Sequence, residues 1–321
     1  MDIDGTPPLE LIVAIEEDDL RLEQLVRRRL PQLSRGSVLR LIERRLVLVD
    51  GRSAVKGLRL RAGQQVVVAA AARSEQPQPQ PELDLELLAV HADVVAINKP
   101  AGRACHPLVP GETGTVANAL VARFPECATA SPSAREGGLV HRLDWSTSGV
   151  LIAARSPEAY GRLRGRFSAR QVVKQYLAVV AGEIVEAGRV TVAVRTMPGD
   201  PTRMQAAPAS GPRVAANDAE TEFEPLERAG GYTLLRLRCR TGRRHQVRVH
   251  MAHVGHPLLG DAAYGGPLLA GAQGAFLHAS RVHLAADELE IVAPLPAERL
   301  RVLGQLGFRD VAVQLSTPDA L

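Results

Sequence analysis

Residues 73–84 limit most how this chain can fold, because they cannot form part of a hydrophobic core. Proline and glutamine alternate over residues 76–81. Proline has a fixed φ and no N–H to donate, so this run favours extended polyproline structure. We therefore predict a small N-terminal domain at residues 15–72, a linker at 73–84, a larger domain at 85–305 and a C-terminal tail at 306–321.

Composition places the chain among globular proteins of a reducing compartment. The 321 residues are 45% hydrophobic, which is ample for a core. The longest apolar run, Val66–Ala72, is too short to span a bilayer, and the acidic start at residues 1–4 does not resemble a signal peptide. Cys105, Cys127 and Cys239 are too widely spaced for a disulfide framework or a zinc site. We expect a cytoplasmic protein with no membrane association.

Positive charge is concentrated in the predicted N-terminal domain. The whole chain carries a net charge of only +4, but residues 20–61 hold twelve Lys or Arg against three acidic residues. Such a cluster favours a phosphate-bearing partner, although a solvated charged face is the alternative. The candidate RNA-binding residues lie on the second predicted helix and just after it: Arg35, Arg40, Arg44 and Arg45.

Two short helices followed by strands are predicted in this domain. The first helix has apolar residues at positions 22, 25, 26 and 30, a cap at Asp18 or Asp19, and an end at Pro31. Ser34 can cap the second helix. Strands at 46–49 and 65–68 follow, with a tight turn at Asp50-Gly51. Over residues 19–68 this pattern resembles the alpha-L RNA-binding domain of the fourth small-subunit ribosomal protein.

The larger domain is organised around the stretch from Leu139 to Ala154. Its polar centre lies between two apolar runs that we expect to be buried strands. Asp144 is expected just past a strand end, where a buried carboxylate needs a cation or hydrogen-bond donors close by. A capped turn, in which Asp144 accepts the amides of Ser146 and Thr147, is the simpler interpretation.

Other elements of this domain follow from local patterns. Helices are predicted at 116–124, within loops at 107–138, and at 158–167, where Ser156 is the cap and Pro157 the first residue. Strands are predicted at 172–182 and 232–239, and the first of these places Lys174 and Tyr176 on one face. Residues 241–250 are interpreted as a further strand and residues 197–218 as an exposed loop.

Several motifs together resemble the RluA-type pseudouridine synthase family over most of residues 85–295. The central motif is His141-Arg142-Leu143-Asp144 followed by Thr147-Ser148-Gly149. Similar matches occur at Asn98–Gly102, at Lys174-x-Tyr176, at Thr241–His250 and from Gly255 through Asp261, Tyr264 and Phe276–Ala279. Trp145 departs from the family pattern, which has a basic or other non-aromatic residue there, and this bears on substrate contacts more than on chemistry.

The resemblance implies an α+β fold with a mixed, largely antiparallel sheet and an RNA cleft. It implies isomerisation of uridine to pseudouridine in structured RNA, with large-subunit ribosomal RNA favoured over transfer RNA, and without a cofactor or metal. Asp144 is implied as the catalytic carboxylate, Arg248 as its ion-pair partner and Tyr176 as the residue that stacks on the base and assists proton transfer. The implied substrate-binding residues are Arg142, which assists base flipping, His141, Leu277 and Lys174.

Rival interpretations remain. A metal site at His245, His250, His253 and His256 lacks a neighbouring cysteine, and a hydrolase built on Ser148 lacks the glycines of a nucleophile elbow. A non-catalytic RNA-binding protein is the main alternative from another functional class. No obligatory protein partner is evident from the sequence, so we expect a monomer.

Overall fold

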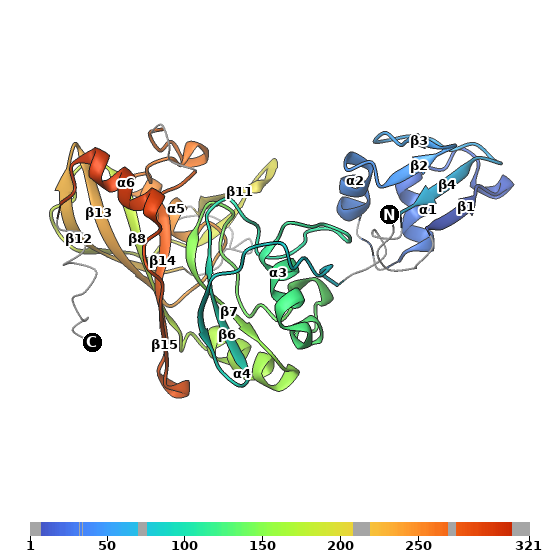
Figure 1. Ribbon diagram of the computed structural model, residues 1–321. Helices are drawn as coiled ribbons and strands as arrows, with labels where there is room; N and C mark the ends of the chain where they lie inside the picture. Colours follow the sequence, from blue (N-terminus) through green and yellow to red (C-terminus); the bar gives the residue numbers. More distant parts are fainter. Residues whose placement is uncertain are drawn as a thin grey trace. The chain divides into compact units, whose positions relative to one another are not determined.

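The computed structural model (Figure 1) describes residues 8–31, 33, 35–69, 76–207, 219–268 and 274–309. The chain forms two compact units, each containing two segments. The N-terminal unit combines Met1–Asp84 with His106–Gly138, and the larger unit combines Leu85–Cys105 with Leu139–Leu321. No helix among the described residues is long and apolar enough to cross a membrane.

Within the described residues, the N-terminal unit contains a four-stranded antiparallel sheet in the order β1 (Leu9–Ile12), β4 (Gln65–Val68), β2 (Val47–Val49) and β3 (Arg52–Ser53). A short 3-10 helix, η1 (Ile15–Glu17), precedes helices α1 (Leu22–Arg29) and α2 (Arg35–Glu43). Apolar residues from both α-helices join those of the strands in a single core, including Leu25, Leu41 and Val66, all fully buried. The predicted helices and strands are thus confirmed here.

Local chemistry explains where these elements begin and turn. Asp50 and Gly51 both have positive φ angles, 49° and 74°, as a tight hairpin between β2 and β3 requires. The predicted cap of α1 is wrong, because the N-cap is Arg21. Asp18 instead accepts the amide of Ala62, and Asp19 pairs with Arg59 at 2.6 Å. The predicted Ser34 cap lies outside the described residues.

The second segment of the N-terminal unit is built around α3 (Val116–Arg123), followed by two 3-10 helices, η3 (Pro125–Thr129) and η4 (Ala134–Glu136). Thr115 caps α3 through a reciprocal pair of bonds with Asn118. Asn118 also donates to the carbonyl of Gln78 at 2.8 Å, so the proline–glutamine run packs along this helix. The domain bounds drawn from the sequence stay a prediction.

Nine strands form one sheet in the described part of the larger unit. Their order is β5 (Leu87–Val90), β6 (Val94–Lys99), β7 (Ser148–Ala154), β14 (Leu277–Leu284), β8 (Val173–Ala181), β13 (Tyr232–Cys239), β12 (Thr221–Ala229) and β9 (Gly188–Val190), with β15 (Leu289–Val292) paired to β14. The β7–β14 pair is parallel and the other pairs are antiparallel. The predicted α+β class with a mixed, largely antiparallel sheet is confirmed.

Alternation along β8 distributes its side chains between two cores. Tyr176, Ala178 and Val180 pack with residues of α5 (Gln246–His253), whereas Leu177 and Val179 pack with residues of α6 (Ala297–Leu306). Helix α4 (Pro157–Ser168) packs against β7. Ser156 caps α4 and Pro157 is its first residue, as predicted. The face of β8 that carries Tyr176 is therefore the face toward α5.

Two predictions in this unit are wrong. Residues 246–253 form helix α5 rather than a continuation of a strand, and the buried residues Val247, His250 and Met251 have helical spacing. Residues 197–218 are not one loop, because β10 (Val194–Met197) and β11 (Asp200–Ala206) form an antiparallel pair. Residues 208–218 lie outside the described residues.

The parallel contact between β7 and β14 depends on a glycine. Gly149 has φ of 109°, and a Cβ there would overlap the backbone carbonyl of Ala279. We expect Gly149→Ala to lower the free energy of unfolding by more than about 2 kcal/mol, because both the φ angle and the close approach exclude a side chain. Urea denaturation measures this change.

Gly161→Ala is the matched control, because Gly161 lies in α4 with nothing within 4 Å of its Cβ position. This change should stabilise the protein by roughly 0.5–1 kcal/mol through helix propensity. Equal stability of the Gly149→Ala variant and the wild type would contradict the proposed steric requirement.

Candidate active site

A pocket of about 560 Å³ opens in the larger unit, beside the loop that precedes β7. Its walls come from residues 141–147, from β8, from the segment between β13 and α5, and from α5 itself. The catalytic and substrate-binding candidates chosen from the sequence all line it: His141, Arg142, Asp144, Lys174, Tyr176, Arg248 and Leu277. The fold thus brings together residues more than 100 positions apart.

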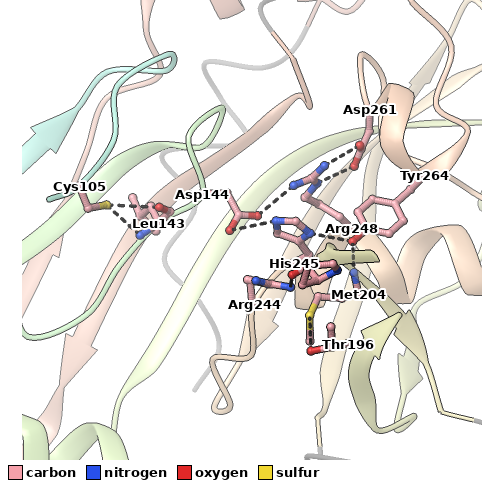
Figure 2. Close-up of polar contacts among 11 residues, drawn as sticks. Cys105, Leu143, Asp144, Thr196, Met204, Arg244, His245, Arg248, Asp261 and Tyr264 are labelled. Atoms are coloured by element: carbon pink, nitrogen blue, oxygen red, sulfur yellow. Dashed lines mark hydrogen bonds and ion pairs between the residues drawn. The ribbon is translucent and has the colours of Figure 1, made fainter. Parts of the chain in front are cut away.

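Asp144 lies in the loop before β7, with 17% of its side chain exposed. Figure 2 shows its carboxylate beside two nitrogen-bearing side chains, those of His245, the N-cap of α5, and of Arg248 in the first turn of α5. Nη1 of Arg248 is 3.4 Å from Oδ2, and Nε2 of His245 is 4.0 Å from Oδ1. The amide of Thr147 donates to the main-chain carbonyl of Asp144, not to its carboxylate. The carboxylate thus faces a cation across the pocket.

Arg248 is held in place by a second carboxylate. Its Nε and Nη2 donate to the two oxygens of Asp261 at 2.7 and 2.8 Å, and the Tyr264 ring centroid lies 4.9 Å from the guanidinium carbon. Burial by itself lowers the pKa of Arg248, but the hydrogen bonds and charge of Asp261, together with the charge of Asp144, raise it overall. The guanidinium therefore stays charged, with Nη1 directed at Asp144 (Figure 2).

His245 is oriented by Tyr264. The Tyr264 hydroxyl oxygen accepts the amide of Met204 at 3.0 Å and lies 2.7 Å from Nδ1 of His245. With the hydroxyl proton donated to Nδ1, the hydrogen of a neutral imidazole is on Nε2, the atom that faces Asp144. Burial lowers the pKa of His245, while the charge of Asp144 opposes this shift. Asp144 thus lies between the guanidinium of Arg248 and the imidazole of His245.

Tyr176 reaches the pocket from β8, and Leu277 from the start of the neighbouring strand β14. Burial raises the pKa of the Tyr176 hydroxyl, and the nearby Cys239 and Asp144 raise it further. The phenol is therefore protonated at neutral pH. Leu277, only 4% exposed, adds an apolar surface to the same pocket.

Two of the candidate substrate-binding residues make structural hydrogen bonds. Lys174 donates to the carbonyl of Thr241 at 2.6 Å, and burial lowers its pKa. His141 accepts the amide of Ile152 on Nε2 at 3.0 Å, and its ring stacks on Phe167 with centroids 4.9 Å apart. Arg142, in contrast, is exposed at the pocket.

Buried cations support the loop that carries Asp144. Nζ of Lys99, fully buried, donates to the carbonyls of Pro100, Arg103 and Trp145 at 2.6–3.2 Å. Nη2 of Arg299 donates to the carbonyls of Ser146 and Ala275, both at 3.0 Å. Burial lowers the pKa of Lys99 to about 8 and that of Arg299 to about 10. Lys99 is therefore a structural hydrogen-bond donor.

Sequence reasoning missed the supporting roles of Asp261, Tyr264 and Arg299. Asp261 and Tyr264 belong to a motif that the sequence singled out, but their contacts with Arg248 and His245 depend on how the chain folds after α5. A signal was available for Asp261, because it is a carboxylate within an otherwise apolar and glycine-rich segment, and such a group needs a cation when buried. Arg299 has no comparable signal.

Two of the four histidines considered for a metal site make other hydrogen bonds. His250 bonds Thr221 and the carbonyl of Val192, and His256 bonds the carbonyl of Ala181. No group of three or more His, Cys, Asp or Glu among the described residues could hold a metal ion.

Comparisons with known proteins agree on one family. A family model described as RNA pseudouridylate synthase matches residues 93–253. The chain is 37% identical over 300 residues to the "Uncharacterized RNA pseudouridine synthase" of Chloroflexus aurantiacus, with 90% of each chain covered. It is 34% identical over 303 residues to the ribosomal large subunit pseudouridine synthase D of Xanthomonas campestris pv. campestris, covering 89% of this chain and 88% of that one. The solved structure of human RNA Pseudouridylate Synthase Domain Containing 4 matches with a TM-score of 0.55 and 26% identity, covering 69% of this chain and 92% of that chain.

The neutral state of His141 predicts a pH dependence of stability. Burial lowers the pKa of His141 to about 3, whereas an unfolded histidine titrates near 6.5. Below about pH 6.5 the unfolded chain binds a proton that the folded chain does not, so stability is lost as pH falls through this window. Between pH 7.5 and 5, urea denaturation should show a loss that is about 2 kcal/mol smaller in His141→Gln than in wild type. His91→Gln, at an exposed position, is the control. Equal losses in His141→Gln and wild type would refute the assignment.

Proposed function

Because this chain belongs to the RNA pseudouridylate synthase family, we propose that it isomerises specific uridines to pseudouridine in large-subunit ribosomal RNA. The observation that carries the proposal is the meeting of Asp144, Arg248 and Tyr176 in one pocket. The ribosomal substrate follows from the name of the Xanthomonas relative, whose length this chain matches almost throughout. We also propose that the protein acts in the cytoplasm as a monomer.

The reaction breaks the bond between C1′ and N1 of uridine, turns the base and joins C1′ to C5. No atoms are gained or lost overall, so no redox or acyl cofactor is required. Asp144 is the group that reacts at the sugar, either by attack on C1′ or by removal of a sugar proton. In both routes it must begin as a carboxylate, and Nη1 of Arg248 lies 3.4 Å from its Oδ2.

Tyr176 and Leu277 contact the uracil base. The apolar body of each side chain can pack against the detached uracil while it turns. Once the new bond has formed, C5 loses its proton and N1, freed from C1′, gains one, so the base gains and loses no protons overall. The Tyr176 hydroxyl, protonated at neutral pH, can hydrogen-bond to the base during this exchange. His141 and Lys174 contribute by holding the pocket wall against Ile152 and Thr241.

Arginine side chains bind the substrate RNA. Reaching C1′ requires the uridine to leave its stack, at a cost of a few kcal/mol. Arg142, exposed beside Asp144, can occupy the vacated space because a guanidinium stacks on bases. In the N-terminal unit, four exposed residues can add phosphate contacts without sequence preference: Arg35, Arg40, Arg44 and Arg45.

The activity and substrate can be tested together. Pseudouridines are mapped on total RNA from cells lacking the gene and from cells complemented with wild type or Asp144→Asn. We expect sites in large-subunit ribosomal RNA to disappear on deletion and to return only with the wild type, because an amide cannot replace the reacting carboxylate. Sites lost from transfer RNA instead would reassign the substrate. A complete absence of lost sites would leave non-catalytic RNA binding as the better interpretation.

The partnership of Arg248 with Asp144 predicts a loss of turnover. In Arg248→Ala the single-turnover rate should fall at least about 100-fold, since a preorganised charged donor is removed from the site. Arg248→Lys should lie between this variant and wild type, because it keeps the charge but loses the fork that grips Asp261. The rate is followed as tritium released from RNA labelled at C5 of uridine. Arg228→Ala, exposed on β12, is the control; unchanged turnover in Arg248→Ala would reject the role.

A further inference from the structure

Trp145 is an exposed aromatic residue whose position no structural requirement explains. It is the single tryptophan of the chain and directly follows Asp144. Its surface is 59% exposed, whereas tryptophan is usually well buried because of its large apolar area. Leu143 and Ser146 of the same loop are buried, whereas the indole, like the side chain of Arg142, is left in solvent.

The backbone that presents this indole is firmly held. The carbonyl of Trp145 accepts hydrogen bonds from Nζ of Lys99 at 3.2 Å and from the amide of Gly102 at 2.9 Å. The next carbonyl, that of Ser146, accepts from Arg299 at 3.0 Å. A planar side chain on a fixed backbone loses little conformational freedom when it meets a ligand, so the loop is preorganised for stacking.

The surroundings favour a polyanionic ligand. Trp145 follows Asp144 in the chain but does not itself line the pocket, and among the described residues that do line it, Asp144 is the single acidic side chain. Eight lysine and arginine side chains line the same pocket, including those of Arg142, Arg243 and Arg244. This charge complements RNA, and both indoles and guanidinium groups stack on nucleobases. Arg142 and Trp145 are exposed planar groups on either side of Asp144 in the sequence.

We propose that Trp145 is a stacking site for an unpaired nucleobase of the RNA that flanks the target uridine. The inference rests on the proposed function for the identity of the RNA. A base inside a duplex has both faces covered by its neighbours, so an indole can stack only on a base in a loop, a bulge or a strand end. Trp145 therefore selects uridines that have an unpaired neighbour.

The single tryptophan provides a direct signal, because all tryptophan fluorescence of the protein comes from Trp145. The full-length Asp144→Asn variant is titrated with an unmodified hairpin fragment of large-subunit ribosomal RNA whose loop contains uridine. The same fragment annealed to its full complement is the paired control, and filter binding measures complex formation separately. We expect fluorescence to be quenched in parallel with hairpin binding and to change little with the duplex.

Substitutions separate stacking from simple apolar contact. In otherwise wild-type enzyme, Trp145→Leu should raise KM for the hairpin about ten-fold with little effect on kcat, as expected when one base–aromatic contact is lost from ground-state and transition-state binding alike. Trp145→Phe should restore most of the affinity. Val185→Ala, which alters another exposed apolar residue at 67% exposure, should match the wild type.

Each outcome bears on one proposal at a time. Hairpin binding without quenching, quenching of equal size with the duplex, or equal KM values for the Leu and Phe variants would overturn the stacking site. Conversion of uridine without quenching would leave the proposed function intact while removing the role of Trp145. Quenching by the hairpin with no uridine converted by the wild type would support the stacking site and count against the enzymatic function.

Discussion

The ion pair between Asp144 and Arg248 is the interaction on which the rest of the site depends. The side chain of Asp144 is only 17% exposed, so protein groups must replace most of the water around its carboxylate. Arg248 cannot serve this purpose alone, because a long side chain must be fixed to hold a 3.4 Å contact. Asp261 fixes it by gripping the guanidinium from the other side through two hydrogen bonds. Arg248 is therefore shared by two carboxylates, of which Asp144 lines the pocket and Asp261 does not.

Asp144 must also be held in position. Hydrogen bonds to the main-chain carbonyls of the residues that follow it do this. The loop turns sharply before β7, so its carbonyls cannot pair in the sheet and need other donors. Lys99 from the end of β6 and Arg299 from α6 provide them at Trp145 and Ser146. Burying two cations without contacting carboxylates is costly, and the lowered pKa values of both residues reflect that cost. Lys99 and Arg299, which lie far from Asp144 in the sequence, thus help to position it.

Local patterns predicted the elements but not the contacts between them. The alternation of β13 and the cap and proline of α4 depend on neighbouring residues alone, and both predictions are confirmed. The strand expected at 241–250 failed because the alternation of valine and charged residues at 247–249 is too short to distinguish a strand from one helical turn. The pairing of Asp261 with Arg248 could not be predicted, since it depends on the path of the chain beyond α5. The sequence motifs nevertheless contained Asp144, Arg248 and Asp261, the three residues that pair in the structure.

In the loop at residues 142–146, the residues that hold the reaction site differ from those whose side chains are exposed to solvent. Asp144 and Ser146 face inward and are fixed by their contacts, so a change there disturbs the pocket or its supports. Arg142 and Trp145 are exposed, and the contacts described for residue 145 are made by its main chain. A side chain held in this way can be exchanged without moving the carboxylate next to it. The loop can therefore accept a different side chain at 145 while the site of reaction is left unchanged.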